Sequence, residues 1–472
     1  MKVGRSDLLW NYGASFMRVA SGFIVLPLIL RMLSSEDSGL WGVMLGLYSM
    51  ILLLDFGFYQ TFSRSVTYIF SGAVKLKPEG LSPVVESGKI NYSLLKGSLK
   101  AMRSYYAGVS IILIILLFTG GYWYIERLLA DYGGDKNIAR AAWYFYGILL
   151  CYQFYTFYYD ALLVGRGMIK KSKQIIVLSQ SVHIILAPIL LLSGFGIPSM
   201  VISQTLSTIV NRYLARRAFY DSETKSNLIK AKAENWKKII KTIWVTAYKS
   251  GLANLSGIFT NRMLAILGAL YIPLSTMGSY STLSKQVVDL TYTLSLVWFS
   301  TYYPKLIQER VTNSLGEVKR IYIKGQFIAI SAFVFIATGI ILFGDWGIRL
   351  IGSPTVFLDT RLMILLFVAA LFEALTYLST SVLLSRNVVP HYKAQVVTAV
   401  FTVVILLITL KYTQLGVASL ILVPFATQLV YQHWRWTLMV MKELGVKFTD
   451  YKNFFANLPG NLGLRNKNLS SS

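Results

Sequence analysis

Ionisable side chains lie inside long apolar segments of this sequence, where a membrane helix would place them in hydrocarbon. Arg18 is near the middle of the first such segment, and later segments contain Asp55, Arg262, Lys285, Asp289 and Glu373. A charged side chain at the centre of a membrane helix costs about 2.5–3.5 kcal/mol even on the most lenient scales. A chain that carries several must shelter them in a polar interior, which is the first candidate for a functional site.

The depth and spacing of these charges indicate different roles. Arg18 and Arg262 are too deep in their segments to reach an interface easily, so we favour a functional role for both. Lys285 and Asp289 are four residues apart on one helix, so they can either pair with each other or serve a site. No basic residue lies in the predicted segment that contains Glu373. The position of Glu373 fits a coupling-ion or proton site and a salt bridge to Arg18 or Arg262 equally well.

Polar side chains recur at helical spacing in five of the predicted helices. Asn11 shares a face with Arg18, Asn254 lies close in angle to Arg262, and Glu373 aligns with threonines on its own helix. Helical spacing brings such residues to one face of each helix. Five polar faces together predict a shared hydrated interior.

Aromatic and basic residues elsewhere allow two interpretations each. One face of the fourth segment carries a tyrosine ladder that could stack against sugar rings, although packing and interfacial anchoring explain most such residues: Tyr144, Tyr152, Tyr155 and Tyr159. Arg64, Arg212 and Lys249 lie within reach of the inner interface, and snorkelling is the favoured interpretation. For His183 we favour hydrogen-bonded packing over a proton relay.

Composition defines the class of protein. The chain has 472 residues, of which 55% are hydrophobic and 14% are charged, whereas about a quarter of the residues of a soluble protein are charged. The single cysteine, Cys151, excludes an intrachain disulfide. We find no nucleotide-binding loop, no metal-ligand spacing and no nucleophile motif. The sequence therefore predicts a membrane protein that is not an enzyme, with no catalytic residues, metal or cofactor.

Twelve segments are long and apolar enough to be membrane helices, since a span needs about 20 such residues. They are Leu8–Leu33, Gly39–Phe62, Tyr105–Ile125, Ile138–Val164, Ile175–Leu192, Gly196–Ala215, Ile243–Ile272, Thr276–Thr301, Tyr322–Phe343, Leu362–Leu384, Gln395–Lys411 and Leu415–Val440. We predict an all-α integral membrane protein with two six-helix bundles, 1–215 and 243–440, around a central cavity. A basic cytoplasmic linker, 216–242, joins the bundles, and a cytoplasmic tail, 441–472, follows.

The distribution of positive charge predicts the orientation. The formal net charge is +25, and lysine and arginine concentrate in alternate loops, in the 216–242 linker and in the tail. Positive loops stay in the cytoplasm, so both termini should be cytoplasmic. The excess charge then reflects topology and a lipid-facing surface rather than nucleic-acid binding. The stretches beginning at Gly39 and at Gly278 also resemble each other faintly, as paired transporter halves do.

Two stretches carry a family resemblance. The sequence Pro27 to Arg64 includes Gly39-Leu40-Trp41, then Leu54-Asp55, Gly57 and a downstream Arg64. It resembles the start of Wzx-type polysaccharide and O-antigen flippases of the multidrug/oligosaccharide-lipid/polysaccharide (MOP) exporter superfamily. The stretch Leu267 to Gln286 resembles the counterpart in the second half, and the twelve spans extend the resemblance over essentially the whole chain.

The resemblance implies a function and a set of roles. It implies alternating access and a substrate of undecaprenyl-pyrophosphate-linked oligosaccharide, moved across the bacterial inner membrane for surface polysaccharide synthesis. Arg18, Arg262 and Lys285 then become candidates for binding the pyrophosphate, because cations suit an anion. Polar cavity candidates are Asn11, Asn254, Asp289, Tyr152 and Tyr155, the coupling candidates are Glu373 and Asp289, and Asp55 and Arg64 form a motif on the cytoplasmic side.

Partners and alternatives follow from the same reasoning. The expected partners are the lipid-linked substrate, membrane lipids, and the polymerase and chain-length proteins of polysaccharide assembly, without nucleic acid. An ion-coupled multidrug exporter of the same superfamily is the main alternative, since Asp55, Asp289 and Glu373 could bind cations. A polysaccharide polymerase or ligase is less favoured, because no outer loop is large enough to carry a catalytic site.

Overall fold

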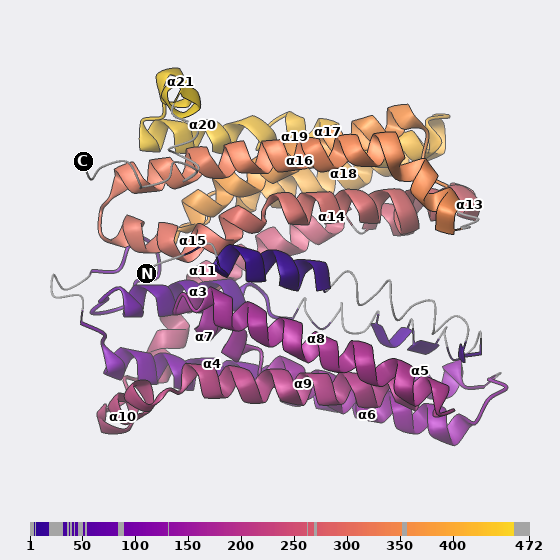
Figure 1. Cartoon of the computed structure of the whole chain (residues 1–472), viewed down its shortest axis with the longest axis horizontal. Coiled ribbons are helices and arrows are strands. Elements are labelled where there is room, and N and C mark those ends of the chain that lie inside the picture. The colour runs from indigo at the N-terminus through magenta and orange to yellow at the C-terminus, as the bar shows by residue number, and fades with distance from the viewer. Residues whose placement is uncertain are drawn as a thin grey trace, which may run out of the picture. The chain divides into compact units, whose positions relative to one another are not determined.

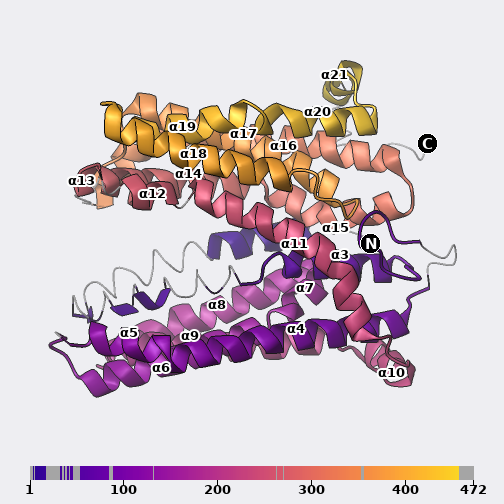
Figure 2. The same ribbon diagram turned by 180° about the vertical axis from the view of Figure 1, so that it is seen from behind.

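The structure, a computed structural model, describes residues 4, 6–17, 32–34, 37, 40–41, 43–45, 51, 54–83, 89–130, 132–261, 263–268, 271–351 and 356–456. Arg18 and Arg262 lie outside the described residues, as do most of the first predicted span and much of the second. Where the structure describes the chain, its regular elements are helices (Figures 1 and 2). The chain divides into two compact units, Met1–Gly251 and Leu252–Ser472, and the division falls inside one helix, α11.

The first unit contains helices that pack around two apolar clusters. One cluster centres on Phe58, Phe62 and Tyr106, and the other on Trp41 and Trp143. The helices are α3 (Phe58–Phe70), α4 (Tyr92–Phe118), α5 (Gly120–Leu128), α6 (Lys136–Tyr155), α7 (Tyr158–Gly165), α8 (Ile169–Leu192), α9 (Pro198–Phe219), α10 (Ser222–Lys230) and the first part of α11 (Trp236–Asn261).

The second unit begins within α11 and has its own core. Phe333, Phe367 and Leu406 are among its buried residues. Its further helices are α12 (Met263–Gly268), α13 (Leu274–Met277), the π-helix η1 (Gly278–Ser284), α14 (Lys285–Ser295), α15 (Val297–Val311), α16 (Leu315–Ile351), α17 (Thr360–Leu384), α18 (Tyr392–Tyr412), the 3₁₀ turn η2 (Gly416–Ala418), α19 (Ser419–Leu429), α20 (Gln432–Leu444) and α21 (Phe448–Ala456).

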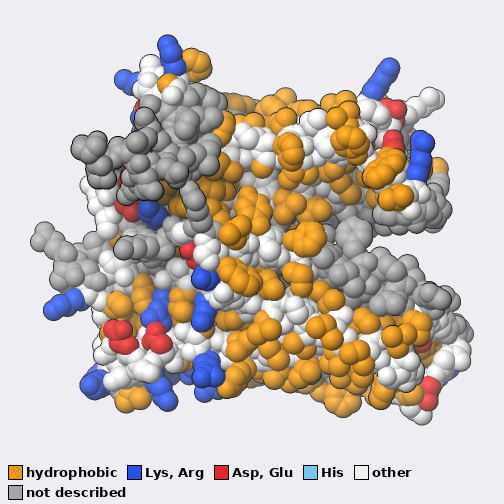
Figure 3. Space-filling view, in the orientation of Figure 1, with side chains coloured by type: hydrophobic (Ala, Val, Ile, Leu, Met, Phe, Trp, Pro, Cys, Tyr) orange, Lys and Arg blue, Asp and Glu red, His pale blue; other side chains and the backbone are white. Residues whose placement is uncertain are grey.

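The chain is a multi-pass membrane protein. Among the described residues, five helices are long and apolar enough to cross a bilayer: Tyr92–Phe118, Ile169–Leu192, Leu315–Leu350, Thr360–Leu384 and Tyr392–Tyr412. Large apolar side chains stand exposed on them, such as Phe335, which is 80% exposed. Figure 3 shows hydrophobic side chains across the visible face of each unit. Such surfaces are stable where lipid covers them.

Several predicted spans are broken rather than continuous. The fourth is divided into α6 and α7 at Thr156, whose hydroxyl donates to the backbone oxygen of Tyr152 at 2.7 Å. The predicted eighth span, Thr276–Thr301, covers the end of α13, then η1 and α14, and the start of α15. Hydropathy measures length and apolarity, so it does not detect such local changes of helical geometry.

The two units repeat a local design. α7 is followed by Arg166 and Gly167, and α17 is followed at a similar distance by Arg386 and Asn387; Gly167 and Asn387 both have left-handed backbone conformations. In each unit the arginine pairs with an acid near the end of the last long helix, Asp221 or Glu443. The paired halves that the sequence shows only faintly are thus visible in helix ends.

Candidate functional site

A polar cavity lies within the second unit. It has a volume of about 120 Å³, enough for several water molecules. Helices α11, α14, α17, α18, α19 and α20 supply its lining residues, which are Ser256, Gly257, Thr260, Tyr292, Glu373, Thr376, Tyr377, Thr380, Gln395, Thr398, Gln428 and Gln432. Apart from the glycine, each of these side chains carries an oxygen, and Glu373 supplies a carboxylate.

Helix α17 brings the carboxylate into this cavity. It is among the most apolar of the described helices, yet it carries Glu373 and three further polar residues that lie three, four and seven positions after it: Thr376, Tyr377 and Thr380. Residues at this spacing share one helical face. The side chain of Asp359 caps the helix by accepting a hydrogen bond from the backbone amide of Arg361 at 3.0 Å. The apolar remainder of the helix faces the core and the lipid, so the polar face lines the cavity.

The cavity wall is held by hydrogen bonds between helices. Thr376 is 2.8 Å from Nδ1 of His433, and Gln432 Nε2 donates to the hydroxyl of Thr398 at 3.1 Å. Gln395 also lines the cavity, but unlike Thr376 and Gln432 it has a buried side-chain oxygen, Oε1, without a hydrogen-bond partner among the described residues. A buried acceptor without a donor costs about 1–3 kcal/mol. The wall therefore favours a guest that donates hydrogen bonds or carries positive charge.

A smaller cavity adjoins the same carboxylate. Its volume is about 40 Å³, and Lys285, Glu373, Gln428 and His433 are among its lining residues. Glu373 and Gln428 line both cavities. An acidic and a basic side chain from different helices, α17 and α14, thus face one small space.

Lys285 pairs with Asp289 on its own helix. The lysine side chain is 20% exposed and that of the aspartate 56%. The four-residue spacing allowed the two residues either to pair with each other or to serve a binding site. In this conformation they form the pair. The pyrophosphate-binding role of Lys285 stays a prediction, since a ligand would have to compete with Asp289.

The helix turn before Lys285 is irregular. η1 occupies Gly278–Ser284 in place of the regular helix that the sequence predicts, and Ser284 Oγ accepts a hydrogen bond from the backbone amide of Leu358 at 3.1 Å. π-helical turns are frequent at functional sites because they redirect a side chain without ending the helix. Lys285, the first residue of α14, follows this turn directly and lines the smaller cavity.

The other cavity candidates are not among the residues that line the two cavities of the second unit. Asn11 is buried in the helical residues 6–17, and Tyr152 and Tyr155 lie on α6 of the first unit, where Tyr152 is 41% exposed. Asn254 is on α11 with an exposed side chain and is not among the residues that line the two cavities. Within the second unit the structure thus brings Lys285, Asp289 and Glu373 together and leaves Asn254 apart.

Asp55 forms a structural centre in the first unit. Its carboxylate accepts the backbone amide of Tyr59 at 3.0 Å and the hydroxyl of Tyr106 at 2.7 Å, so it caps α3. The backbone before the helix turns sharply, with φ angles of +47° at Phe56 and +78° at Gly57. The predicted span Gly39–Phe62 is therefore broken after Leu54. The acid is explained by this break, since its oxygens satisfy a helix start.

The basic residues predicted to snorkel make contacts within the first unit, and Arg64 is the most buried of them. Arg64 is 2% exposed and donates to the Thr61 hydroxyl at 3.2 Å. Arg212 pairs with Asp160 at 2.7 Å, and Lys249 pairs with Glu79. Snorkelling requires an exposed head group, so the burial of Arg64 inside the unit contradicts this interpretation for Arg64. His183 is 3.0 Å from the Ser203 hydroxyl, as hydrogen-bonded packing requires.

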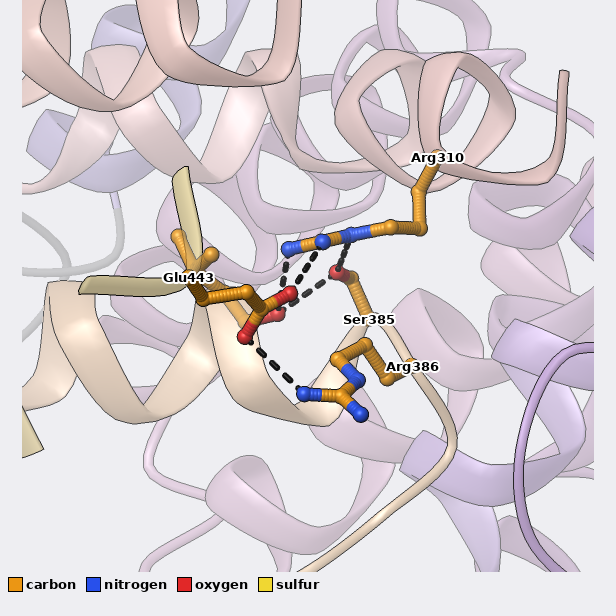
Figure 4. A network of polar contacts seen from close by, with 5 residues as sticks. Arg310, Ser385, Arg386 and Glu443 are labelled. Atoms are coloured by element: carbon orange, nitrogen blue, oxygen red, sulfur yellow. Dashed lines mark hydrogen bonds and ion pairs between the residues drawn. The ribbon is translucent and has the colours of Figure 1, made fainter. Parts of the chain in front are cut away.

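The second unit contains an ion-pair network that was not predicted from the sequence. Arg310 of α15 and Arg386, after α17, both donate to the carboxylate of Glu443 on α20 (Figure 4). Arg310 also donates to the Ser385 hydroxyl at 3.3 Å. The signal was present, because Glu443 is an acid among the basic residues of a predicted cytoplasmic segment. Counting charge per loop conceals such a residue.

The fold is that of MATE transporters of the MOP superfamily. A crystal structure of a MATE protein in the bent conformation has a TM-score of 0.70 at 14% identity, covering 96% of this chain and 96% of that one. An outward-facing multidrug resistance MATE family transporter of the MOP superfamily has a TM-score of 0.68 at 14% identity, over 93% and 95% of the two chains.

A third solved structure shows that this fold hosts pockets of different polarity. A MOP superfamily transporter from Pyrococcus furiosus Vc1 has a TM-score of 0.68 at 13% identity, over 93% and 94% of the two chains, and is described as having a binding pocket of reverse polarity that suggests a different function. No protein-family model and no curated protein matches the chain. At these identities the likeness establishes the fold, and it confirms the expected all-α arrangement in two bundles.

Proposed function

We propose that this protein is an ion-coupled membrane transporter in which Glu373 binds the coupling ion. The observation that carries the proposal is a carboxylate in a cavity whose other lining groups are hydroxyls and amides. Oxygen ligands of this kind suit a proton or a small hard cation. A carboxylate that exchanges an ion with solvent can bias two conformations, because a ligand shifts an equilibrium only by binding the two states differently.

The proposed substrate is an undecaprenyl-pyrophosphate-linked oligosaccharide. Support comes from the flippase-like stretches and from the cations predicted in deep positions, Arg18, Arg262 and Lys285. Arginine binds phosphate through paired, charge-assisted hydrogen bonds. The proposal places the protein in a bacterial inner membrane with both termini in the cytoplasm, working with membrane lipids and with the polymerase and chain-length proteins of polysaccharide assembly.

Export of cationic drugs is a second candidate function. Two observations favour it: the positive charge of Lys285 is compensated by Asp289, and the acid Glu373 is among the lining residues of the polar cavity. One of the structures with the same fold is a multidrug resistance transporter. A polymerase or ligase activity has less support, since the similar solved structures described above are transporters.

Reconstitution separates the two functions. The protein is placed in liposomes with a fluorescent pyrophosphate-linked lipid sugar, and transport is followed with and without a sodium or proton gradient. We expect gradient-dependent movement of the lipid-linked sugar. Glu373→Gln should slow it about tenfold or more and remove its gradient dependence while substrate still binds. Movement of ethidium-like cations, and never of the lipid-linked sugar, would establish the drug-export function instead.

A matched variant controls for the loss of an acid. Glu317 lies at the start of α16, where its side chain is 44% exposed and pairs with Arg320 at 3.5 Å. Glu317→Gln therefore removes the same charge outside the cavity. We expect it to transport like the unmodified protein. Gradient-dependent transport that survives unchanged in Glu373→Gln would show that Glu373 does not bind the coupling ion.

A further inference from the structure

Glu373 faces two cavities, and a lysine lines one of them. The carboxylate belongs to the lining of the polar cavity and of the smaller cavity, whereas Lys285 lines only the smaller one. A space of about 40 Å³ holds only a few water molecules, so rotation of the lysine side chain is enough to bring its ammonium group toward Glu373. Among the described residues, the other titratable side chains that line the two cavities are Tyr280, Tyr292, Tyr377 and His433.

The acid that pairs with Lys285 in this conformation is well exposed. The side chain of Asp289 is 56% exposed, compared with 20% for the lysine. Solvent screens an exposed ion pair, so the pair contributes little and Asp289 loses little when the lysine leaves. Glu373 is only partly exposed, and a nearby cation stabilises an enclosed carboxylate more strongly. The two acids therefore differ in how much the lysine stabilises them.

The backbone around Lys285 is anchored. Ser284 and Val288, which lie before and after it in the chain, are fully buried, and Ser284 Oγ accepts a hydrogen bond from the backbone amide of Leu358 at 3.1 Å. The lysine carries its ammonium group on a long, flexible chain. A change of partner therefore needs rotation of one side chain and no movement of the helix.

We propose that Lys285 is the internal counter-ion of the coupling site and changes its partner as the ion binds and leaves; this rests on the function proposed for Glu373. With the ion at Glu373, the lysine pairs with Asp289, as it does in this conformation. When the ion leaves, the ammonium group turns to Glu373, and Asp289 is left to the solvent. The lysine thus competes with the ion for one carboxylate, and the two occupants stabilise different arrangements of the same site, as coupling requires.

The affinity of the full-length protein for the ion tests this exchange. An ion that binds the folded state raises the midpoint of thermal unfolding as its concentration increases. The probes are sodium chloride, exchanged for choline chloride at constant ionic strength, and protons in sodium-free buffer. The coupling ion is the one that raises the midpoint of the unmodified protein more than that of Glu373→Gln, and its titration gives an apparent Kd.

Single variants should shift this Kd in opposite directions. Lys285→Gln removes the competitor and should lower the apparent Kd about threefold or more, because a larger fraction of Glu373 is then available to the ion. Asp289→Asn removes the alternative partner of the lysine and should raise the apparent Kd by a similar factor. The matched variants Lys319→Gln and Asp450→Asn each break a lysine–aspartate pair of the second unit that does not line the two cavities, and both should leave the Kd unchanged.

The double variant distinguishes an exchange of partners from a simple addition of charges. In an exchange Asp289 acts through the lysine, so Asp289→Asn should have no further effect once Lys285→Gln is present. If each charge acts directly on the ion, Asp289→Asn will raise the Kd by the same factor in both backgrounds, and the proposal is overturned. Size-exclusion profiles verify that each protein is folded.

The failure of this proposal and the failure of the proposed function give different results. Ion binding that is lost in Glu373→Gln but unchanged in Lys285→Gln would overturn the exchange alone and assign the counter-charge to Arg18 or Arg262, which lie outside the described residues. An equal response of the unmodified protein and Glu373→Gln to both ions would overturn the ion-binding role of Glu373 and the exchange with it.

Discussion

Arg310 is a charged residue that is buried within the second unit. It is 3% exposed, and its charge is balanced by Glu443, whose side chain is 18% exposed. Removing one partner of a buried ion pair leaves an uncompensated charge, which costs about 3–5 kcal/mol. Arg386 shares the same carboxylate, but its side chain is 43% exposed. Exposed pairs contribute only about 0–1 kcal/mol.

These exposures predict an order of effects. Glu443→Gln should destabilise the protein by about 3 kcal/mol, and Arg386→Gln by no more than about 1 kcal/mol. The midpoint of thermal unfolding in detergent, followed by size-exclusion chromatography, measures both. Equal losses in the two variants would mean that burial does not govern the strength of this network.

A second prediction at the residue scale concerns the substrate and the two arginines that the sequence places deep in their segments, Arg18 and Arg262. Arg18→Ala and Arg262→Ala should abolish surface polysaccharide in cells while membrane insertion is retained, since each removes charge-assisted hydrogen bonds to phosphate. Lysine should substitute poorly if the contact is bidentate. Polysaccharide levels at matched protein abundance provide the measurement, and normal levels in either alanine variant would remove that arginine from the proposed site.

At the scale of elements, the break before α3 depends on close packing against α11. A Cβ atom on Gly57 would lie 2.8 Å from the backbone nitrogen of Gly251, and a Cβ atom on Gly251 would lie 2.6 Å from the Phe56 ring. Tyr105 donates its hydroxyl to the backbone oxygens of Leu54 and Asp55 at 3.1 and 3.2 Å. The turn is therefore held in two ways: Tyr105 donates hydrogen bonds to its backbone, and Gly57 packs closely against Gly251 of α11.

Three glycine substitutions separate strain from crowding. Gly80 has φ +79°, almost the same as Gly57, but open space around it. Gly80→Ala should cost about 1–2 kcal/mol from left-handed strain alone, and Gly57→Ala should cost about 1–3 kcal/mol more from overpacking. Gly251→Ala, within a helix, isolates the crowding. Thermal midpoints test the series, and a Gly57→Ala loss no larger than that of Gly80→Ala would argue against the close approach.

Helix ends provide another element-scale prediction. Asn313 follows α15 with φ +60°, in the position that Gly72, with φ +93°, occupies after α3. Asn313→Gly should be nearly neutral because glycine adopts this conformation freely. Asn313→Val should cost about 1–2 kcal/mol, since a β-branched residue is strained there. Denaturation of the two variants side by side is the measurement; similar stabilities would show that the left-handed turn can relax.

For the whole molecule, the sequence predicts the class of fold better than the internal geometry. Apolar segment length is a property of each helix alone, so the all-α membrane fold and the deep acid Glu373 could be predicted. The cavity around Glu373 depends on side chains from six helices, and its members Gln395 and Gln432 are ordinary polar residues in sequence. The buried state of Arg64 depends on where α3 begins, which a hydropathy pattern does not contain. Features that depend on contacts between helices, such as this cavity, could therefore not be predicted from the sequence.

The matching helix ends of the two units have a consequence for the history of the gene. Arg166–Gly167 with Asp221, and Arg386–Asn387 with Glu443, repeat one arrangement at corresponding places. Such agreement points to tandem duplication of an ancestral half. Because six crossings return a chain to the side from which it started, both copies would have inserted with the same orientation, and the ancestor could have functioned as a homodimer. The arginine and acid that each copy still carries would then be older than the covalent connection between them.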